Sequence, residues 1–241
     1  MQKTDQEISR LTRRSFLTGG IASAAGFGTW MWIRHSFQEG GIPKPLRRAE
    51  QADDVFSRAL FSQSRLARTF DAADIGEARA NGDIGLADDI DPDWKLEIEG
   101  ANAVSIDQIK ALPKFEEITQ FKCIEGWSEI VHWAGIRMAD FMEAYLPALI
   151  DGGEPKFVYM ETPDGDYYTG YDLNVCRHPQ TLLVTEMMGA PLTQYHGAPL
   201  RLHMPTKYGY KQIKRIGLIS YTNRKPDDYW TKLGYDWYAG L

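Results

Sequence analysis

Residues 118–128 read ITQFKCIEGWS and give the strongest single indication of how the chain folds. The alternation of apolar and polar residues up to Ile124 predicts a half-buried β-strand. Cys123 lies where this strand ends, and Gly126 follows in the loop behind it. Binding and catalytic residues gather in loops at strand ends, and a thiolate is a ligand for soft transition metals. On composition alone, a buried and inert cysteine is the commoner alternative.

Short predicted strands and short predicted helices interleave on both sides of this stretch. Further strands are predicted at Trp94–Glu99, Phe157–Met160, Leu200–Met204 and Ile216–Tyr221, and helices at Ile106–Leu112, Gly135–Leu146 and Pro179–Met188. Residues 71–93 are rich in Asp, Gly and Ala and predict a loop, and Pro163–Asp166 predicts a turn. Because these elements follow no regular strand–helix–strand rhythm, we predict a mixed α+β domain.

The composition excludes several classes of protein. A length of 241 residues suits one catalytic domain with a leader. An apolar content of 43% supports a hydrophobic core and is too low for a polytopic membrane protein. The net charge of −6 predicts no nucleic-acid partner. Two cysteines are too few for a disulfide framework and lack the paired spacing of a zinc site. A single disulfide between them is the alternative.

The charge distribution is strongly uneven near the C-terminus. No Asp or Glu occurs from Met187 to Pro226. The same stretch contains seven basic residues, namely Arg201, Lys207, Lys211, Lys214, Arg215, Arg224 and Lys225. Such a cluster in an acidic protein favours an anionic ligand, with phosphate the usual one. A solvated basic surface is the alternative.

The N-terminus has the pattern of an export signal. Residues 12–17 read TRRSFL, and an apolar run continues to Ile33. A positive flank before an apolar segment predicts export, and adjacent arginines followed by Phe-Leu are typical of the twin-arginine type. A chance Arg-Arg pair before a buried helix is the alternative. The run is just long enough to span a bilayer. We therefore expect a periplasmic protein anchored to the inner membrane, with cleavage near Ala24 as the alternative.

Several separated motifs together resemble the sulfite oxidase superfamily of molybdenum enzymes. The motifs are CIEGWS at 123–128, VHWAG at 131–135, HPQTLL at 178–183, GAPL at 189–192, HGAPLRL at 196–202 and KYGYKQIK at 207–214, with a weaker NGDIG at 81–85. They occur in the family's order from about Trp94 to Tyr221. The resemblance implies a mixed-sheet molybdopterin-binding domain. It also implies Mo-molybdopterin as the cofactor, with the metal held by a dithiolene, a cysteine thiolate and oxo groups.

The resemblance also implies the residues of the site. Cys123 corresponds to the metal ligand and catalytic centre. Contacts to the pterin and its phosphate are implied for Asn81, Thr162, His196, Arg201, Lys211, Gln212 and Lys214. Three of these residues also have a structural alternative. Thr162 is typical of a turn cap, and His196 and Asn81 are typical of turns. Cys176 corresponds to no ligand, and we expect it to be a small core residue.

The residues after Cys123 bear on the substrate. Eukaryotic-type sulfite oxidases have a short basic run there, whereas this chain has an acid and an aromatic, Glu125 and Trp127. The pattern is similar to the periplasmic methionine-sulfoxide-reducing members, although those tend to have Asn at the position of His196. We expect oxygen-atom transfer on a small S-oxide or N-oxide, with sulfite oxidation as the alternative. The competing classes are a cofactor-free periplasmic binding module and a thiol redox protein using Cys123 and Cys176.

The organisation of the chain follows from these assignments. We predict a signal or anchor at 1–33, a linker and wrapping segment at 34–70, a molybdopterin-binding oxidoreductase domain at 71–225 and an aromatic tail at 226–241. No haem domain is recognisable, so the resemblance implies a separate membrane cytochrome b as the redox partner. The tail is expected either to join the substrate pocket or partner surface, or to pack as a strap.

Overall fold

The chain folds into two compact units, Met1–Asp53 and Asp54–Leu241. This computed structural model describes residues 5–39, 41–87, 89–146 and 153–241. The first unit contains α1 (Asp5–His35), the short antiparallel pair β1 (Gln38–Glu39) and β2 (Ile42–Pro43), and the start of α2 (Lys44–Leu60). The division falls within the predicted linker, and the finer boundaries at residues 33, 70 and 225 stay predictions.

Within the described residues, no helix is both long and apolar enough to cross a membrane. We expected the apolar run at residues 16–33 to be just long enough to span a bilayer, but it does not form a helix of the required length and hydropathy. It lies within α1, but glycines, threonines and a serine interrupt it and lower its mean hydropathy.

The helix α2 lies within the predicted linker and wrapping segment, where no helix was predicted. This helix has 17 residues and begins at Lys44. Pro45 stands in its first turn, where the missing backbone N–H costs no hydrogen bond. A proline at this position therefore starts the helix.

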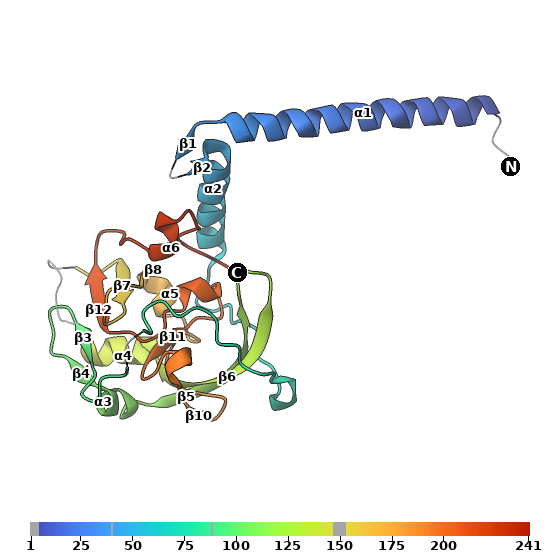
Figure 1. Ribbon diagram of the computed structural model, residues 1–241. Helices are drawn as coiled ribbons and strands as arrows, with labels where there is room; N and C mark the ends of the chain where they lie inside the picture. Colours follow the sequence, from blue (N-terminus) through green and yellow to red (C-terminus); the bar gives the residue numbers. More distant parts are fainter. Residues whose placement is uncertain (1–4, 40, 88, 147–152) are drawn as a thin grey trace. The chain divides into compact units, whose positions relative to one another are not determined.

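The second unit is built on two five-stranded sheets (Figure 1). The first sheet has the order β10-β9-β6-β5, with β11 pairing β9, and every pairing in it is antiparallel. Its strands are β5 (Lys114–Lys122), β6 (Ser128–Arg137), β9 (Leu182–Met187), β10 (Ala190–Pro191) and β11 (Arg201–His203). Strands β5 and β6 form a hairpin whose pairing runs from Lys114↔Ile136 to Lys122↔Ser128. The hairpin therefore presents Cys123 in its turn.

The second sheet has the order β4-β3-β12-β7-β8. Its strands are β3 (Lys95–Ile98), β4 (Val104–Ser105), β7 (Phe157–Glu161), β8 (Tyr168–Asp172) and β12 (Leu218–Thr222). Strand β12 runs parallel to β3 and antiparallel to β7, so the sheet is mixed. The short helices of this unit are α3 (Ile106–Lys110), α4 (Met138–Tyr145), α5 (Leu173–Cys176) and α6 (Tyr229–Lys232), with 3-10 turns at Ala72–Asp74, Gln194–His196 and Gly209–Lys211. The predicted α+β class is confirmed.

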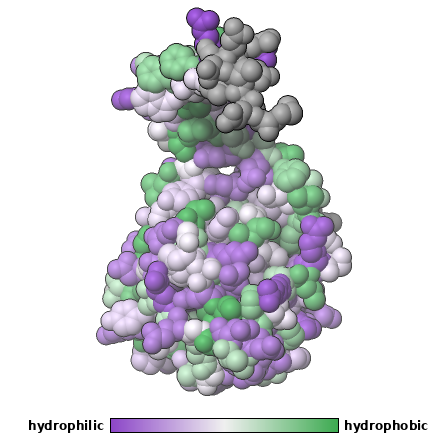
Figure 2. Space-filling model, turned by 90° about the vertical axis from the view of Figure 1, so that its right-hand side faces the viewer, coloured by the Kyte–Doolittle hydropathy of each residue, from purple (hydrophilic) through white to green (hydrophobic). Residues whose placement is uncertain are grey.

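One large core cluster draws residues from both sheets. Leu96, Ile219, Leu183 and Leu202 belong to it, and so does Cys176, which is fully buried as expected. Neither cysteine forms a disulfide. A smaller cluster beside the first sheet contains Val131, Trp133 and Leu182. On the face of the larger body shown in Figure 2, hydrophobic residues are interspersed with hydrophilic ones.

The helix predicted at Pro179–Met188 is wrong. Residues Leu182–Met187 form β9, which lies between β6 on one side and β10 and β11 on the other. Five of its six side chains are buried, so the apolar residues form a continuous run with no alternation. A strand of this kind has the same apolar pattern as a buried helix. The helix predicted from Gly135 begins only at Met138, because β6 continues to Arg137.

Candidate functional site

One cavity brings together most of the predicted site residues. Its lining includes six of them, namely Asn81, Cys123, His196, Arg201, Gln212 and Lys214. Thr162 and Lys211 are not part of the lining. The six come from the loop before β3, the β5–β6 turn and the segment from 196 to 214, so distant stretches of sequence converge here.

The β5–β6 turn fixes the position of Cys123. Its backbone N–H donates to the carbonyl of Trp127 at 2.9 Å, and Gly126 N–H donates to the Cys123 carbonyl at 3.2 Å. The ring of Phe121 stacks on that of Trp127, with centroids 5.8 Å apart. Burial raises the pKa of the Cys123 thiol. The metal-free sulfur therefore keeps its proton at neutral pH, and a bound metal would displace it.

Asn81 lies directly beside the cysteine. Its side-chain amide nitrogen is 3.9 Å from Cys123 Sγ and donates to Glu125 Oε2 at 3.3 Å. The indole N–H of Trp127 donates to the same carboxylate oxygen at 2.9 Å. The weakest of the sequence motifs therefore contributes an amide at the sulfur, and the Glu125 carboxylate is held by two donors.

Arg79 also lines the cavity, although no sequence pattern indicated it as a site residue. Its guanidinium lies 4.7 Å from the ring centre of Trp127. Its backbone N–H donates to Glu129 Oε2 at 2.8 Å, and Glu129 lines the cavity too. Burial raises the pKa of Glu129. A lone arginine in a predicted loop has no distinguishing pattern, and only the fold brings it to the turn that carries Cys123.

Arg201 forms the deep, basic end of the cavity. The residue is 4% exposed, yet no ion pair to it occurs in the described part of the chain. Its Nη1 donates to the carbonyl of His196 at 3.0 Å, and its buried Nε has no partner. Burial lowers the pKa of Arg201 to about 10, so it remains a cation at neutral pH. Its guanidinium lies 5.0 Å from the ring centre of Trp133, and the Glu129 carboxylate offers it a counter-charge without a direct ion pair. A buried guanidinium without a direct ion pair is costly, and an anion in the cavity would offset that cost.

Lys214 and His196 lie near this guanidinium. The ammonium of Lys214 donates to the carbonyls of Asn81, Gly82 and Tyr195, each at 2.8 Å, and so ties two loops together. Burial and the charge of Arg201 lower the pKa of Lys214 to about 8. Burial, Arg201 and Lys214 lower the pKa of His196, which is therefore neutral at pH 7.

Gly197 allows Lys214 to pack closely against the loop that carries His196. It has a φ of +93°, and a Cβ there would lie 2.7 Å from the Cβ of Lys214. A side chain would clash, and the left-handed backbone also favours glycine. The HGAPLRL motif therefore includes a glycine that lets His196 and Lys214 approach each other.

Gln212 is fixed by the protein itself. Its amide nitrogen donates to the carbonyls of Met204 and Lys207, both at 3.0 Å. Its amide oxygen therefore faces His203 Nδ1, at 2.9 Å. The imidazole of His203 stacks on Trp133, with centroids 4.5 Å apart. This buried arrangement supports the wall of the cavity from behind.

Thr162 has the turn-capping role that the sequence left open. Its hydroxyl donates to Asp164 Oδ1 at 2.5 Å and accepts from Tyr167 N–H at 3.1 Å. Gly85 has a φ of +77°, and a Cβ there would lie 2.4 Å from Thr162 Cγ2. Thr162 therefore packs under the loop that carries Asn81 and reaches the cavity only through it.

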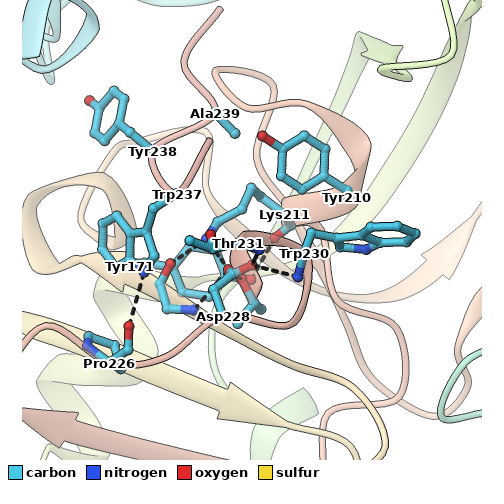
Figure 3. A network of polar contacts seen from close by, with 12 residues as sticks. Tyr171, Tyr210, Lys211, Pro226, Asp228, Trp230, Thr231, Trp237, Tyr238 and Ala239 are labelled. Carbon is cyan, nitrogen blue, oxygen red and sulfur yellow. Dashed lines mark hydrogen bonds and ion pairs between the residues drawn. The ribbon is translucent and has the colours of Figure 1, made fainter. Parts of the chain in front are cut away.

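The Lys211 side chain points into the protein. Its ammonium pairs with Asp228 Oδ2 and donates to the carbonyl of Gly170 at 2.7 Å (Figure 3). Both side chains of the pair are 1% exposed. The ammonium therefore does not reach the cavity, contrary to the contact that the resemblance implies for this residue.

The chain is similar to known molybdenum-cofactor proteins. The family model "Oxidoreductase molybdopterin binding domain" matches residues 83–230. A protein of Azospira oryzae named as protein-methionine-sulfoxide reductase subunit YedZ1 is 36% identical over 151 residues, covering 61% of this chain and 56% of the relative. The protein-methionine-sulfoxide reductase catalytic subunit MsrP of Xanthomonas campestris is 31% identical, covering 58% of this chain and 48% of the relative. The chain thus spans about half the length of these relatives.

A solved structure supports the fold. The sulfane dehydrogenase SoxCD of Paracoccus pantotrophus superposes with a TM-score of 0.51 and 15% sequence identity, covering 58% of this chain and 41% of that one. At this identity the likeness concerns the fold alone.

The residues of the cavity fit a molybdopterin. Cys123 offers one thiol at the turn, where a soft metal needs a ligand from the protein. Arg201 offers a buried guanidinium whose Nε lacks a partner, which matches the phosphate of the cofactor. The family model covers more than half of the chain, and the fold and donor set agree with it. The chain belongs to the oxidoreductase molybdopterin-binding domain family, and its cofactor is Mo-molybdopterin.

Proposed function

We propose that this chain reduces S-oxides to thioethers by oxygen-atom transfer in the cavity at Cys123. Two electrons and two protons convert the S-oxide into the thioether and one water. Bound molybdopterin supplies a molybdenum centre that exchanges an oxygen atom as it changes oxidation state by two electrons. The names of the similar proteins point to methionine sulfoxide in proteins as the natural form of the substrate.

Each cavity residue has a proposed part in this reaction. Cys123 ligates the metal. Arg201, Lys214 and His196 hold the phosphate end of the cofactor, and Gln212 shapes the wall beside it. Asn81, next to the sulfur, orients groups at the metal through its amide.

The observation that carries the substrate class is the charge around Cys123. Glu125 and Glu129 line this part of the cavity, with Arg79 as the cation beside them. A dianion such as sulfite would face two carboxylates there, and its desolvation would be poorly compensated. A neutral S-oxide needs only a donor for its oxygen, which the Arg79 guanidinium or the Asn81 amide can supply.

We also propose that the enzyme acts in the periplasm and takes its electrons from a membrane cytochrome b. The pattern at Arg13-Arg14 supports twin-arginine export, which carries folded and cofactor-loaded proteins. A cytochrome delivers one electron at a time, so the two electrons of each turnover would arrive in two separate transfers.

Steady-state turnover of purified, metal-loaded protein tests the proposal. Reduced viologen serves as the electron donor for sulfoxides and N-oxides, and ferricyanide as the acceptor for sulfite. We expect sulfoxides to give the highest kcat/KM. Turnover of sulfite with a higher kcat/KM than any sulfoxide would contradict the proposal and favour the sulfite-oxidising alternative.

A further inference from the structure

The C-terminal segment, residues 226–241, contributes aromatic side chains to the cavity at Cys123. Trp230 and Tyr235 belong to the lining, together with Tyr167 and Tyr210. The rings of Trp230 and Tyr235 meet edge to face with centroids 5.0 Å apart, and those of Tyr210 and Tyr235 at 5.5 Å. The rings of Trp230, Tyr235 and Tyr210 are in contact, and Tyr167 adjoins them through a hydrogen bond to the Tyr210 carbonyl. These four side chains are called here the aromatic wall.

The aromatic wall presents mainly carbon to the cavity. The Tyr210 hydroxyl donates to the carbonyl of Asp236 at 2.8 Å, and the Tyr167 hydroxyl donates to the carbonyl of Tyr210. These two hydroxyls are therefore engaged within the protein. A pterin needs donors and acceptors along its edges, whereas ring faces of this kind suit an apolar or sulfur-bearing group.

The aromatic wall lies toward the mouth of the cavity. Tyr235 is 37% exposed and Ile124, next to Cys123, is 45% exposed, whereas Arg201 is 4% exposed. The phosphate-binding end is therefore deep, and the aromatic end is open to solvent. Tyr235 and the turn that carries Cys123 therefore both lie at the open end of the cavity.

The Asp228 carboxylate holds the start of the C-terminal segment in place. Asp228 Oδ1 accepts hydrogen bonds from the backbone N–H groups of Trp230 at 3.1 Å and Thr231 at 3.2 Å (Figure 3). Its other oxygen accepts from the Thr169 hydroxyl at 2.8 Å and pairs with Lys211. The carboxylate therefore caps α6 and fixes the start of the tail.

The ion pair connects the two halves of the aromatic wall. Lys211 follows Tyr210 directly in the turn Gly209–Lys211, and Asp228 precedes Trp230 by two residues. The pair thus joins the turn that carries Tyr210 to the tail that carries Trp230. Displacement of either partner would therefore disturb the positions of Tyr210 and Trp230.

We propose that the aromatic wall selects substrates, with Trp230 and Tyr235 contacting the apolar group of an S-oxide and Lys211 acting as a positioning residue through Asp228. The proposal rests on the proposed function for the identity of the substrate. It assigns the Lys211 ammonium to the substrate side of the site and removes it from the contacts to the phosphate.

The test compares methyl phenyl sulfoxide with dimethyl sulfoxide on the holoenzyme, by turnover and by equilibrium binding to the oxidised form. Trp230→Ala should lower the ratio of kcat/KM for the aryl over the dimethyl substrate about tenfold, with the same loss in the ratio of binding constants. Leu233→Ala is the matched control, since Leu233 lies in the same tail, is 58% exposed and is not in the lining. It should leave both ratios unchanged.

Lys211→Met and the milder Asp228→Asn test the positioning role. Both should raise KM for the aryl substrate more than they lower kcat, while the pterin and molybdenum content per folded protein stays at the parent level. If Lys211→Met does not fold, Asp228→Asn provides the same comparison, because Asn retains an acceptor for the α6 cap.

The outcomes separate the two proposals. A Trp230→Ala ratio equal to that of the parent overturns the role of the aromatic wall. Loss of pterin from Lys211→Met or Asp228→Asn at an unchanged substrate ratio overturns the positioning role. A parent that turns over no sulfoxide, but binds the aryl compound about tenfold more tightly than Trp230→Ala does, supports the wall and contradicts the proposed function.

Discussion

Arg201 and Lys211 come from the same acid-free segment and are both almost completely buried, yet their environments are opposite. Arg201 lines the cavity, has no ion pair among the described residues, and keeps a buried Nε without a partner. Lys211 is paired with Asp228 and bonded to the carbonyl of Gly170, outside the cavity lining. The Arg201 guanidinium is available to a ligand, whereas the Lys211 ammonium stabilises the fold.

The contrast shows what separates a binding charge from a structural one. A buried cation is stabilised by a direct ion pair, so a buried guanidinium without one and with an unpartnered Nε indicates the place of an anionic ligand. The basic cluster in the sequence predicts an anionic ligand, and the buried position of Arg201 in the cavity agrees with that prediction. It did not indicate which of its members would meet that anion, because the partner of Lys211 lies 17 residues further along the chain.

The largest expected effect comes from Cys123→Ser, which separates the metal end of the cavity from the phosphate end. Activity should fall below detection, because the hydroxyl is a poor replacement for a thiolate ligand. Pterin should remain bound, since Arg201 and Lys214 are untouched. Cys176→Ala is the control, and it should retain activity because Cys176 is a core residue. Substantial oxygen transfer by Cys123→Ser would remove Cys123 from the site.

The next effect concerns Lys211 and the free energy of unfolding. Lys211→Met leaves the Asp228 carboxylate buried and unpaired, and should destabilise the protein by about 3–5 kcal/mol. The double variant Lys211→Met with Asp228→Asn should recover a large part of that loss. Denaturant unfolding of both variants is the measurement.

The exposed pair Lys232–Asp227 is the control for this experiment, with side chains 56% and 74% exposed. Lys232→Met should cost far less stability than Lys211→Met, because solvent screens an exposed pair. Equal losses in Lys211→Met and Lys232→Met would contradict a structural role for the buried pair.

Arg201→Ala should act mainly on cofactor binding. A charge-assisted contact to a buried phosphate is worth roughly 1.5–3 kcal/mol, so pterin occupancy at limiting supply should fall about tenfold or more. Arg224→Ala removes an exposed arginine of the same segment and should leave occupancy unchanged. Pterin content of the two variants, made under the same conditions, checks the prediction. Equal occupancy would remove Arg201 from the phosphate end.

The smallest effect is a pH dependence of cofactor retention. The pKa of Lys214 is lowered to about 8, so its charge is present below that pH and lost above it. An anion nearby is held less tightly once the charge is lost, and pterin release should be faster at pH 9 than at pH 7 by up to about tenfold. In Lys214→Met this difference should disappear. Pterin fluorescence in the filtrate of washed holoenzyme measures the release.

A strand is easiest to predict where it is covered on one face only, because its buried and exposed residues then alternate. Lys95–Ile98 alternates between exposed and buried residues, and the predicted strand there is confirmed. Strand β9 could not be predicted, because it is buried on both faces and gives no alternation. The helix α2 was not predicted, although Pro45 in its first turn is compatible with a helix.

The site was predictable where a residue type limits the chemistry. A cysteine at a strand end and an arginine in an acid-free stretch each have few roles, and both line the cavity. Threonine and lysine have many possible roles. The partners of Thr162 in the turn and of Lys211 in the tail indicate which role each residue has. Arg79 could not be found, since only the packing of its loop against Trp127 gives it a role.

The proposed reaction is tested most directly by stopped-flow spectra of the molybdenum centre in the holoenzyme. Reduced enzyme mixed with dimethyl or methyl phenyl sulfoxide should be reoxidised much faster than oxidised enzyme is reduced by the same concentration of sulfite, because Glu125 and Glu129 disfavour a dianion near Cys123. Faster reduction by sulfite than reoxidation by every sulfoxide would contradict the proposed direction and substrate class.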